Sequence, residues 1–431
     1  MKNTIQNELK ELVANGLITQ QNADLIGQYY QKNNIKPQNR LVAVFGILGA
    51  LLVGLGIMLI VAHNWDKLNV GIKTVLAFLP LIVGQGFCIY SLWKKPDNTN
   101  LKEGSAVFTM IGLGTSIALM SQIYNNGGSL ESFMFWWMIL SVGIVYLMRS
   151  DMASLLYIIG ITWFGSITGY GYKHEFNFEY WALLLLIVPY YYLLIKRAPK
   201  GNYTFFHHWL IPLSVTIVFG TLAISHEEWM LLAYFGLFLL WQQVAALWIE
   251  PAKSKGELPY LIIGSFGCIA ILMSMTFHSL WEDLLNDEGK LSILLKTPEF
   301  VLCILLFFIN TLIWFYKLRR DGFNSTLYLQ LALLLVYPIF YLGFWFSGFV
   351  TLITNLLVLA IGLFALWQGA HRQHLGLLNY GLLIIAVLIT CRYFDTQIPF
   401  IIRGLMFVAL GLAFFFTNYL TLKRRKYDET T

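Results

Sequence analysis

Residues 322–370, "GFNSTLYLQLALLLVYPIFYLGFWFSGFVTLITNLLVLAIGLFALWQGA", contain no Asp, Glu, Lys or Arg. As one helix rising 1.5 Å per residue, this stretch would be about 74 Å long, more than twice the roughly 30 Å hydrocarbon core of a bilayer. It must therefore fold back, and Ser347-Gly348 is the natural place for the turn. The stretch predicts two membrane-spanning helices joined by a tight connection.

The composition extends this interpretation to the whole chain. The protein is 58% hydrophobic and 12% charged, whereas a soluble domain carries about 25% charged residues. The first apolar run is too long for a cleaved signal peptide, so the first span is expected to stay in the mature protein. These features predict an integral membrane protein.

Apolar runs of membrane-spanning length recur along the sequence. They predict an all-α fold, a polytopic transmembrane helix bundle of about 14 spans. A second tight hairpin is predicted at Arg149-Ser150-Asp151. The predicted spans are 41–62, 70–93, 104–124, 133–149, 152–170, 180–195, 208–225, 229–249, 258–278, 299–316, 326–346, 348–368, 374–391 and 399–420.

The basic residues orient these spans. If both termini and every second loop share one side, 22 of the 29 Lys and Arg residues lie there and 7 lie on the other side. Cytoplasmic loops of membrane proteins carry such an excess. We therefore expect a multi-pass protein of the cell membrane with both termini cytoplasmic. The basic pI reflects this topology and does not imply nucleic acid as a partner.

The N-terminal segment is polar and differs from the rest. We divide the chain into a cytoplasmic helical hairpin, residues 1–36, and a transmembrane domain, residues 37–431. Asn15-Gly16 is typical of a helix C-terminus, and Thr19 can cap a second helix. The apolar stripe of the hairpin could bind a protein partner or pack on the membrane domain of the same chain.

Polar residues gather where three predicted spans end outside. Span 1 ends in His63-Asn64-Trp65-Asp66, and span 3 ends in 121–128, "SQIYNNGG". The last two spans meet at 391–395, "CRYFD", and Arg403 lies about one turn into the final span. The predicted topology puts all three groups on one membrane face.

Four segments of the chain resemble a family of prokaryotic predicted membrane proteins, known as domain of unknown function twenty-one fifty-seven. They are "ELVANGLITQQNADLIGQYY", "GLGIMLIVAHNWDKL", "SQIYNNGGSLESFMFWW" and "CRYFDT…FIIRGLMFVALGLAFF". The resemblance covers about the first 170 residues and the last 40. It implies the architecture but no activity. It also implies the importance of Asn64, Trp65, Asp66, Gln122, Tyr124, Arg392, Asp395 and Arg403.

The cluster at the end of span 1 has two interpretations. In the structural one, Trp65 belongs to the outer aromatic belt, Asn64 closes the helix and Asp66 caps the next helical segment. In the functional one, Asp66 lies at the mouth of a cavity. Lys73 and Arg403 favour the second, because each lies about one turn inside a span, where an unpaired charge costs roughly 2–3 kcal/mol.

Amides within the spans are further candidates. Gln85 lies between Gly84 and Gly86 near mid-membrane, after Pro80, where a broken helix could line a transport path. The alternative is a proline kink packed on small residues. Three more amides are expected to join helices by hydrogen bonds: Asn310, Asn355 and Asn379.

The sequence carries no cofactor or metal signature. There is no phosphate loop, no nucleotide-binding fingerprint and no compact metal-ligand motif, so neither a cofactor nor a metal is expected. The four cysteines are expected to be small apolar side chains without disulfides. His278 and Glu282 are four residues apart and are predicted to share a helix face.

Three functions remain open. The first is a transporter or flippase-like handler of a small or lipid-linked substrate with a polar outer mouth. The second is a membrane-embedded transferase with an outward active site, and the third is a non-catalytic scaffold or sensor; whether the protein is an enzyme is undecided. The candidate binding residues are Asn64, Trp65, Asp66, Lys73, Gln85, Gln122, Tyr124, Arg392, Asp395 and Arg403. For the first function, those expected to act are Asp66, Lys73, Gln85, Gln122, Arg392 and Arg403.

Overall fold

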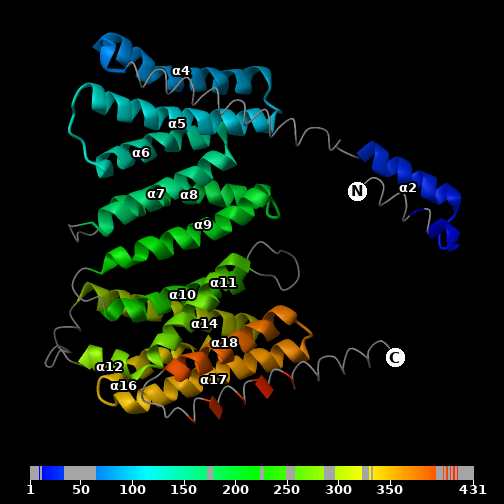
Figure 1. Ribbon diagram of the computed structural model, residues 1–431, viewed down its shortest axis with the longest axis vertical. Coiled ribbons are helices and arrows are strands. Elements are labelled where there is room, and N and C mark those ends of the chain that lie inside the picture. Colours follow the sequence, from blue (N-terminus) through cyan, green and yellow to red (C-terminus); the bar gives the residue numbers. More distant parts are fainter. Residues whose placement is uncertain are drawn as a thin grey trace. The chain divides into compact units, whose positions relative to one another are not determined.

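The computed structural model of the chain describes most of the predicted membrane domain (Figure 1). The described residues are 9, 12–33, 65–171, 178–223, 228–248, 258–285, 297–322, 330–331 and 333–394, with a few single positions between 401 and 415. Over these residues the chain forms helices joined by turns, with no strand. It divides into two compact units, Met1–Leu76 and Ala77–Thr431.

The first unit contains the described part of the predicted N-terminal hairpin. A helical turn ends at Gly16, whose φ of +70° glycine adopts without strain. The Asn22 N–H donates to the Thr19 hydroxyl at 3.3 Å, just before α2 (Gln20–Asn33). The predicted C-terminal glycine and N-capping threonine are therefore confirmed. The same unit contains a short 3₁₀ helix, η1 (Trp65–Lys67), and the start of α4 (Val70–Lys94).

The second unit is a row of packed helices. After α4 come α5 (Thr99–Ile123), α6 (Leu130–Met148), α7 (Asp151–Gly169), α8 (Phe178–Arg197), α9 (Asn202–Phe219) and η2 (Gly220–Leu222). They are followed by α10 (Glu228–Trp248), α11 (Leu258–Met275), α12 (His278–Leu285), α14 (Pro298–Asp321), α16 (Val336–Gly343), α17 (Ser347–His371) and α18 (Leu375–Phe394).

Both predicted hairpin turns are present. Arg149 adopts a left-handed conformation (φ 46°, ψ 47°) after α6, and the Ser150 hydroxyl caps α7 by accepting from the Ala153 N–H at 3.1 Å. Between α16 and α17 the chain turns back at 344–346, just before the predicted Ser347-Gly348, and these two residues begin α17. In each case the adjoining helices pack on each other.

The predicted number of spans is only partly confirmed. Among the described residues, nine helices are long and apolar enough to cross a membrane, and α10 and α11 contain shorter apolar segments. Within the predicted span 326–346, residues 330–331 and 333–334 are helical, and a turn at Leu335 separates them from the short α16. Residues 326–329 and 332 of this span lie outside the described residues. The predicted span 41–62 and most of 399–420 lie outside the described residues.

Contacts between helix ends agree with successive helices that run in opposite directions, so that every second loop lies on the same side. The Glu103 carboxylate, at the start of α5, accepts hydrogen bonds from the N–H groups of Asp151 (3.0 Å) and Met152 (2.9 Å). Asp151 in turn accepts from Arg197 at 2.6 Å and from the Tyr190 hydroxyl at 2.7 Å. Three loops that the charge pattern assigned to one side, 94–103, 149–151 and 196–200, thus lie together. That this side is cytoplasmic stays a prediction.

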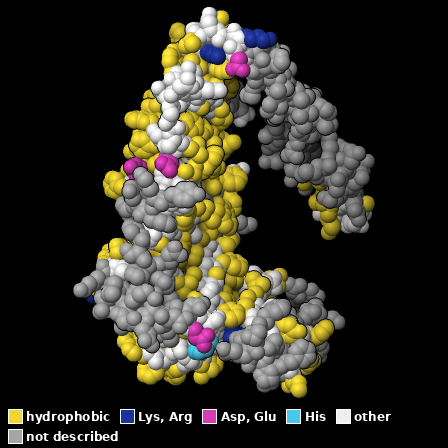
Figure 2. Space-filling model, turned by 60° about the vertical axis from the view of Figure 1, so that its left-hand side comes forward, with side chains coloured by type: hydrophobic (Ala, Val, Ile, Leu, Met, Phe, Trp, Pro, Cys, Tyr) yellow, Lys and Arg dark blue, Asp and Glu magenta, His cyan; other side chains and the backbone are white. Residues whose placement is uncertain are grey.

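The surface of the described helices is largely hydrophobic (Figure 2), and charged side chains occur in a few small groups. Large apolar residues are exposed on the long helices, as suits contact with lipid. All four cysteines are free, as predicted.

Candidate functional site

The predicted site residues at the end of span 1 lie at the surface of the first unit. Asp66 is exposed on η1. The Lys73 ammonium lies 5.7 Å from the centre of the Trp65 ring, which provides a cation–π contact. The side chain of Asn69, not that of Asp66, caps α4 by accepting from the Ile72 N–H at 2.8 Å. Asn64 lies outside the described residues.

The structure does not bring the predicted residues of the second unit together. Gln122 and Tyr124 are exposed at the end of α5, and Arg392 lies near the end of α18. Within this unit, α5 packs on α6 and α7, whereas α18 packs on α17 (Figure 1). Asp395 and Arg403 lie outside the described residues.

Arg392 belongs to a compact polar cluster where α11 ends. It donates to the Thr276 hydroxyl at 3.2 Å and lies 4.4 Å from the centre of the Phe277 ring. The Asn355 amide donates to the Thr276 carbonyl at 3.0 Å, and the Thr354 hydroxyl donates to the Met275 carbonyl at 3.0 Å. These contacts join α11, α17 and α18 at one end. They confirm that the Asn355 amide connects helices.

Gln85 lies on the exposed side of α4. Its neighbour Gly84 packs on α5, since a Cβ there would lie 2.9 Å from the Thr109 Cα. The Pro80 carbonyl group lies against Gly112 in the same way. These contacts correspond to the alternative of a proline kink packed on small residues.

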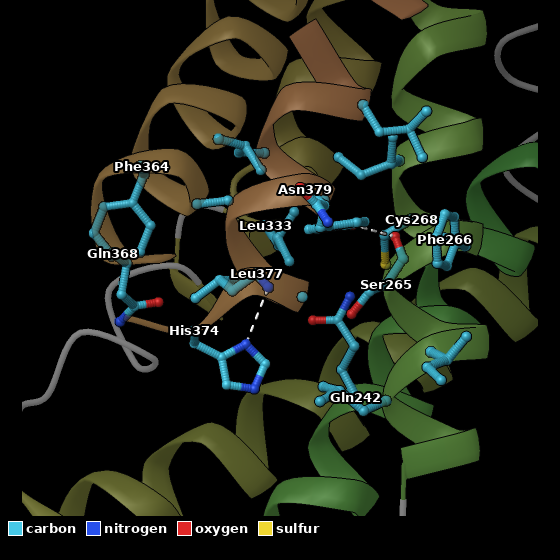
Figure 3. A pocket seen from close by; sticks show the side chains of 18 of the residues that line it. Gln242, Ser265, Phe266, Cys268, Leu333, Phe364, Gln368, His374, Leu377 and Asn379 are labelled. Atoms are coloured by element: carbon cyan, nitrogen blue, oxygen red, sulfur yellow. Dashed lines mark hydrogen bonds between the residues drawn. The ribbon is translucent and has the colours of Figure 1, made fainter. Parts of the chain in front are cut away.

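The opposite end of α11, α17 and α18 contains a cavity of about 600 Å³, which none of the predicted site residues lines. It lies between the pair α10–α11 and the pair α17–α18 (Figure 3), and Gln330 and Leu333 complete its wall. Its lining is mostly apolar and includes Leu261, Phe266, Ile269, Leu333, Ile361, Phe364 and Leu383. Ligand sites commonly have this size and an apolar wall with a few polar groups.

Glycines hold each helix pair together beside the cavity. On α11, a Cβ at Gly264 would lie 2.5 Å from the Phe238 carbonyl oxygen of α10. On α18, a Cβ at Gly381 would lie 2.5 Å from the Leu366 backbone nitrogen of α17. Because small residues let helix backbones approach closely, each pair forms a tight unit.

Beside the cavity a polar contact also joins the two pairs. The Tyr380 hydroxyl of α18 donates to the Ser265 carbonyl of α11 at 2.9 Å, and the Tyr380 ring packs edge-on against Phe266 with centroids 5.4 Å apart. All three residues line the cavity.

Polar groups gather at one part of the lining. Figure 3 shows the Gln242 amide pointing into the space between His374 and Ser265. The His374 Nδ1 accepts from the Leu377 N–H at 3.1 Å, so in the neutral ring Nε2 carries the proton and can donate. Gln330, also on the wall, accepts from the Lys317 ammonium at 2.9 Å. The site thus combines an apolar wall with amide groups and a nearby cation.

This cavity is not among the sites predicted from the sequence. Lys317 lies just beyond the predicted span 299–316, yet it is only 4% exposed. Asn379 was expected to join helices, but it lines the cavity. The available signal was Gln242-Gln243, an amide pair within an otherwise apolar run. Among the described residues, no group of three or more His, Cys, Asp and Glu side chains is arranged to hold a metal ion.

The long apolar helices, with large hydrophobic side chains exposed on their surfaces, define a multi-pass integral membrane protein. Residues 10–154 match the model of a family described as predicted membrane protein (DUF2157). This match confirms the resemblance over residues 10–154. The resemblance of residues 391–415 to the same family lies outside the matched range and stays a prediction. The family description names no activity. No curated protein and no solved structure matches the chain.

Proposed function

We propose that this membrane protein takes up an amphipathic molecule, such as a lipid or a lipid-linked compound, from the bilayer and moves it between leaflets. The observation that carries the proposal is the cavity between α10–α11 and α17–α18. Its apolar wall suits a hydrocarbon chain, and the amides of Gln242 and Gln330 suit a polar headgroup.

The two ends of α11, α17 and α18 differ, and this difference supports a cavity that opens toward one side of the membrane only. At the end that contains Arg392, side chains from α17 and α18 bond to the residues that end α11. At the other end the cavity lies between the same helices, next to the hydrogen bond from Tyr380 to Ser265. Under the orientation predicted from the basic residues, this arrangement is an inward-facing state with the outer end closed. Transporters alternate between such states around a central site.

Filling the cavity should slow lipid movement. Ala365 is 5% exposed and lines the cavity from α17. Overpacking a site costs about 1–3 kcal/mol, so Ala365→Phe should lower the flipping rate roughly 5- to 150-fold. The purified full chain is reconstituted in liposomes with fluorescent phosphatidylglycerol or phosphatidylcholine. Dithionite then bleaches the fluorophores of the outer leaflet, and further loss of fluorescence reports flipping.

The matched control is Leu363→Phe, two residues away on the exposed side of α17. It should flip lipid at the wild-type rate. The proposal is wrong if the wild type moves neither lipid faster than protein-free liposomes do. It is equally wrong if both phenylalanine variants slow movement alike.

A further inference from the structure

One amide in the cavity wall has no partner among the described residues. Gln242 is only 7% exposed, and no hydrogen bond within the described part of the chain involves its side chain. Figure 3 shows the amide aimed into the space between His374 and Ser265. A buried polar group without a hydrogen bond is costly. This amide is therefore expected to bond to a molecule that enters the cavity.

The packing of α10 on α11 holds the Gln242 side chain in place. A Cβ at Gly264 of α11 would lie 2.8 Å from the Gln242 Cγ, closer than such atoms approach. Glycine at position 264 thus makes room for the stem of Gln242 between the two helices, and the amide at its end reaches the cavity. Because the stem is packed, the amide loses little conformational freedom when it binds a ligand.

The polar part of the cavity wall is uncharged. None of the described residues that line the cavity is Asp, Glu, Lys or Arg. Lys317 donates to Gln330 but does not itself line the cavity. A buried charge is costly unless an opposite charge and hydrogen bonds compensate it, so such a wall favours an uncharged polar group. The polar lining residues are Gln242, Ser265, Gln330, Gln368, His374, Asn379 and Tyr380.

Hydroxyl groups match the hydrogen-bonding capacity of this wall. The Gln242 amide has an oxygen that accepts and an NH₂ group that donates, and a hydroxyl group also does both. The neutral His374 ring adds a donor at Nε2, because its Nδ1 accepts from the Leu377 N–H. Two neighbouring hydroxyls of one headgroup can therefore use both ends of the Gln242 amide. A phosphate oxygen only accepts and an ammonium only donates, so each would satisfy one end alone.

We propose that the cavity recognises a headgroup rich in hydroxyl groups, such as a glycerol or a sugar, through the Gln242 amide. The inference rests on the proposed function and specifies its substrate class. The hydroxyls supply the partners that Gln242 lacks, and the hydrocarbon chain lies along the apolar wall. A phosphate elsewhere in the same lipid is not part of what is recognised.

Binding of three fluorescent lipids to the purified full chain tests this inference. Phosphatidylglycerol and phosphatidylmethanol carry the same phosphodiester charge, but only the first has hydroxyls in its headgroup. Monoglucosyl diacylglycerol has hydroxyls and no charge. The protein is held in polyoxyethylene detergent, which carries no sugar or glycerol, at about pH 8, where histidine is neutral. Each hydroxyl-bearing lipid should bind about tenfold more tightly than phosphatidylmethanol.

Gln242→Met removes the recognising amide with little other change. Methionine keeps the Cγ that packs at Gly264 and has a similar length. The variant should reduce both preferences to less than about twofold. Its unfolding midpoint should not fall, because no hydrogen bond within the described part of the chain is lost. Gln21→Met removes the same group from an exposed position of α2 and should leave both preferences unchanged.

A second variant guards against loss of folding in Gln242→Met. Asn379 lines the cavity from α18 and is exposed, so Asn379→Leu puts little of the fold at risk. It removes an amide from the opposite side of the same space. Each preference should fall about threefold or more.

The inference is overturned if phosphatidylmethanol binds as tightly as the other two lipids. It is also overturned if the preferences survive in both Gln242→Met and Asn379→Leu, or if Gln21→Met loses them equally. Tighter binding of the glucosyl lipid than of phosphatidylglycerol would identify a sugar as the source of the hydroxyls, and the reverse order would identify glycerol; both support the inference.

Failure of the proposed function gives different results. If the chain binds the hydroxyl-bearing lipids selectively but does not move them between leaflets, the proposed function alone is wrong. If it binds none of the three lipids, both the proposed function and the inference are wrong.

Discussion

Replacing Glu103 with alanine should destabilise the membrane domain by about 3 kcal/mol. The Glu103 carboxylate is 8% exposed and accepts hydrogen bonds from the Ser150 hydroxyl and from the first two N–H groups of α7. Its negative charge also lies at the N-terminus of α7, where the helix dipole is positive. Alanine would leave these buried donors without their acceptor. Reversible unfolding in mixed detergent and dodecyl sulfate micelles, followed by circular dichroism, measures the loss.

Glu131→Ala is the matched control. Glu131 also lies in the first turn of a helix, α6, but its side chain is exposed. Its removal should cost less than about 1 kcal/mol, the usual size of an exposed charge–dipole interaction. Equal losses in the two variants would mean that Glu103 does not hold α5 to the turn between α6 and α7.

Replacing Gly381 with valine should be at least as damaging, by about 3 kcal/mol or more. A Cβ at this position would lie 2.5 Å from the Leu366 backbone nitrogen and 2.7 Å from the Gly362 carbonyl oxygen. Backbone atoms cannot move aside as a flexible side chain can, so α17 and α18 would have to separate. Because this pair forms one side of the cavity, the variant should also lose lipid binding. The same unfolding and binding measurements test both effects.

Gly143→Val on α6 is the matched control, because it distinguishes the effect of this clash from the effect of the helix propensity of valine. No atom lies within 4 Å of a Cβ built at Gly143, so the substitution changes only the local helix propensity, by less than about 1 kcal/mol. If Gly381→Val were no worse than Gly143→Val, the close approach of α17 and α18 would not be required for stability.

The positions of the helices could be predicted because hydropathy and helix length are local properties. A charge-free stretch too long for one span must turn, and the chain turns just before Ser347. A charged Arg149-Ser150-Asp151 between two apolar runs likewise ends one helix and caps the next. The exact number of spans was harder to predict from the sequence, because a run such as 326–346 has the hydropathy of one span, yet its described residues are interrupted by a turn at Leu335 before α16.

The candidate site could not be predicted in the same way. Hydropathy assigns a residue to one side of a membrane, but it does not say which helices are neighbours. Gln122 and Arg392 were assigned to the same face, yet their helices pack on different partners. The cavity joins Gln242, Gln330 and His374, which are far apart in the sequence, and their proximity depends on glycine contacts that only the folded chain reveals.

Density in the cavity is the most direct test of the central claim. The full chain would be imaged by electron cryomicroscopy in nanodiscs that contain phosphatidylglycerol. We predict elongated density between α11 and α18, with its headgroup end at Gln242 and Gln330 and its chain along Phe266 and Ile361. A cavity closed by side chains, or one that holds only water at the level of Lys317, would contradict the account.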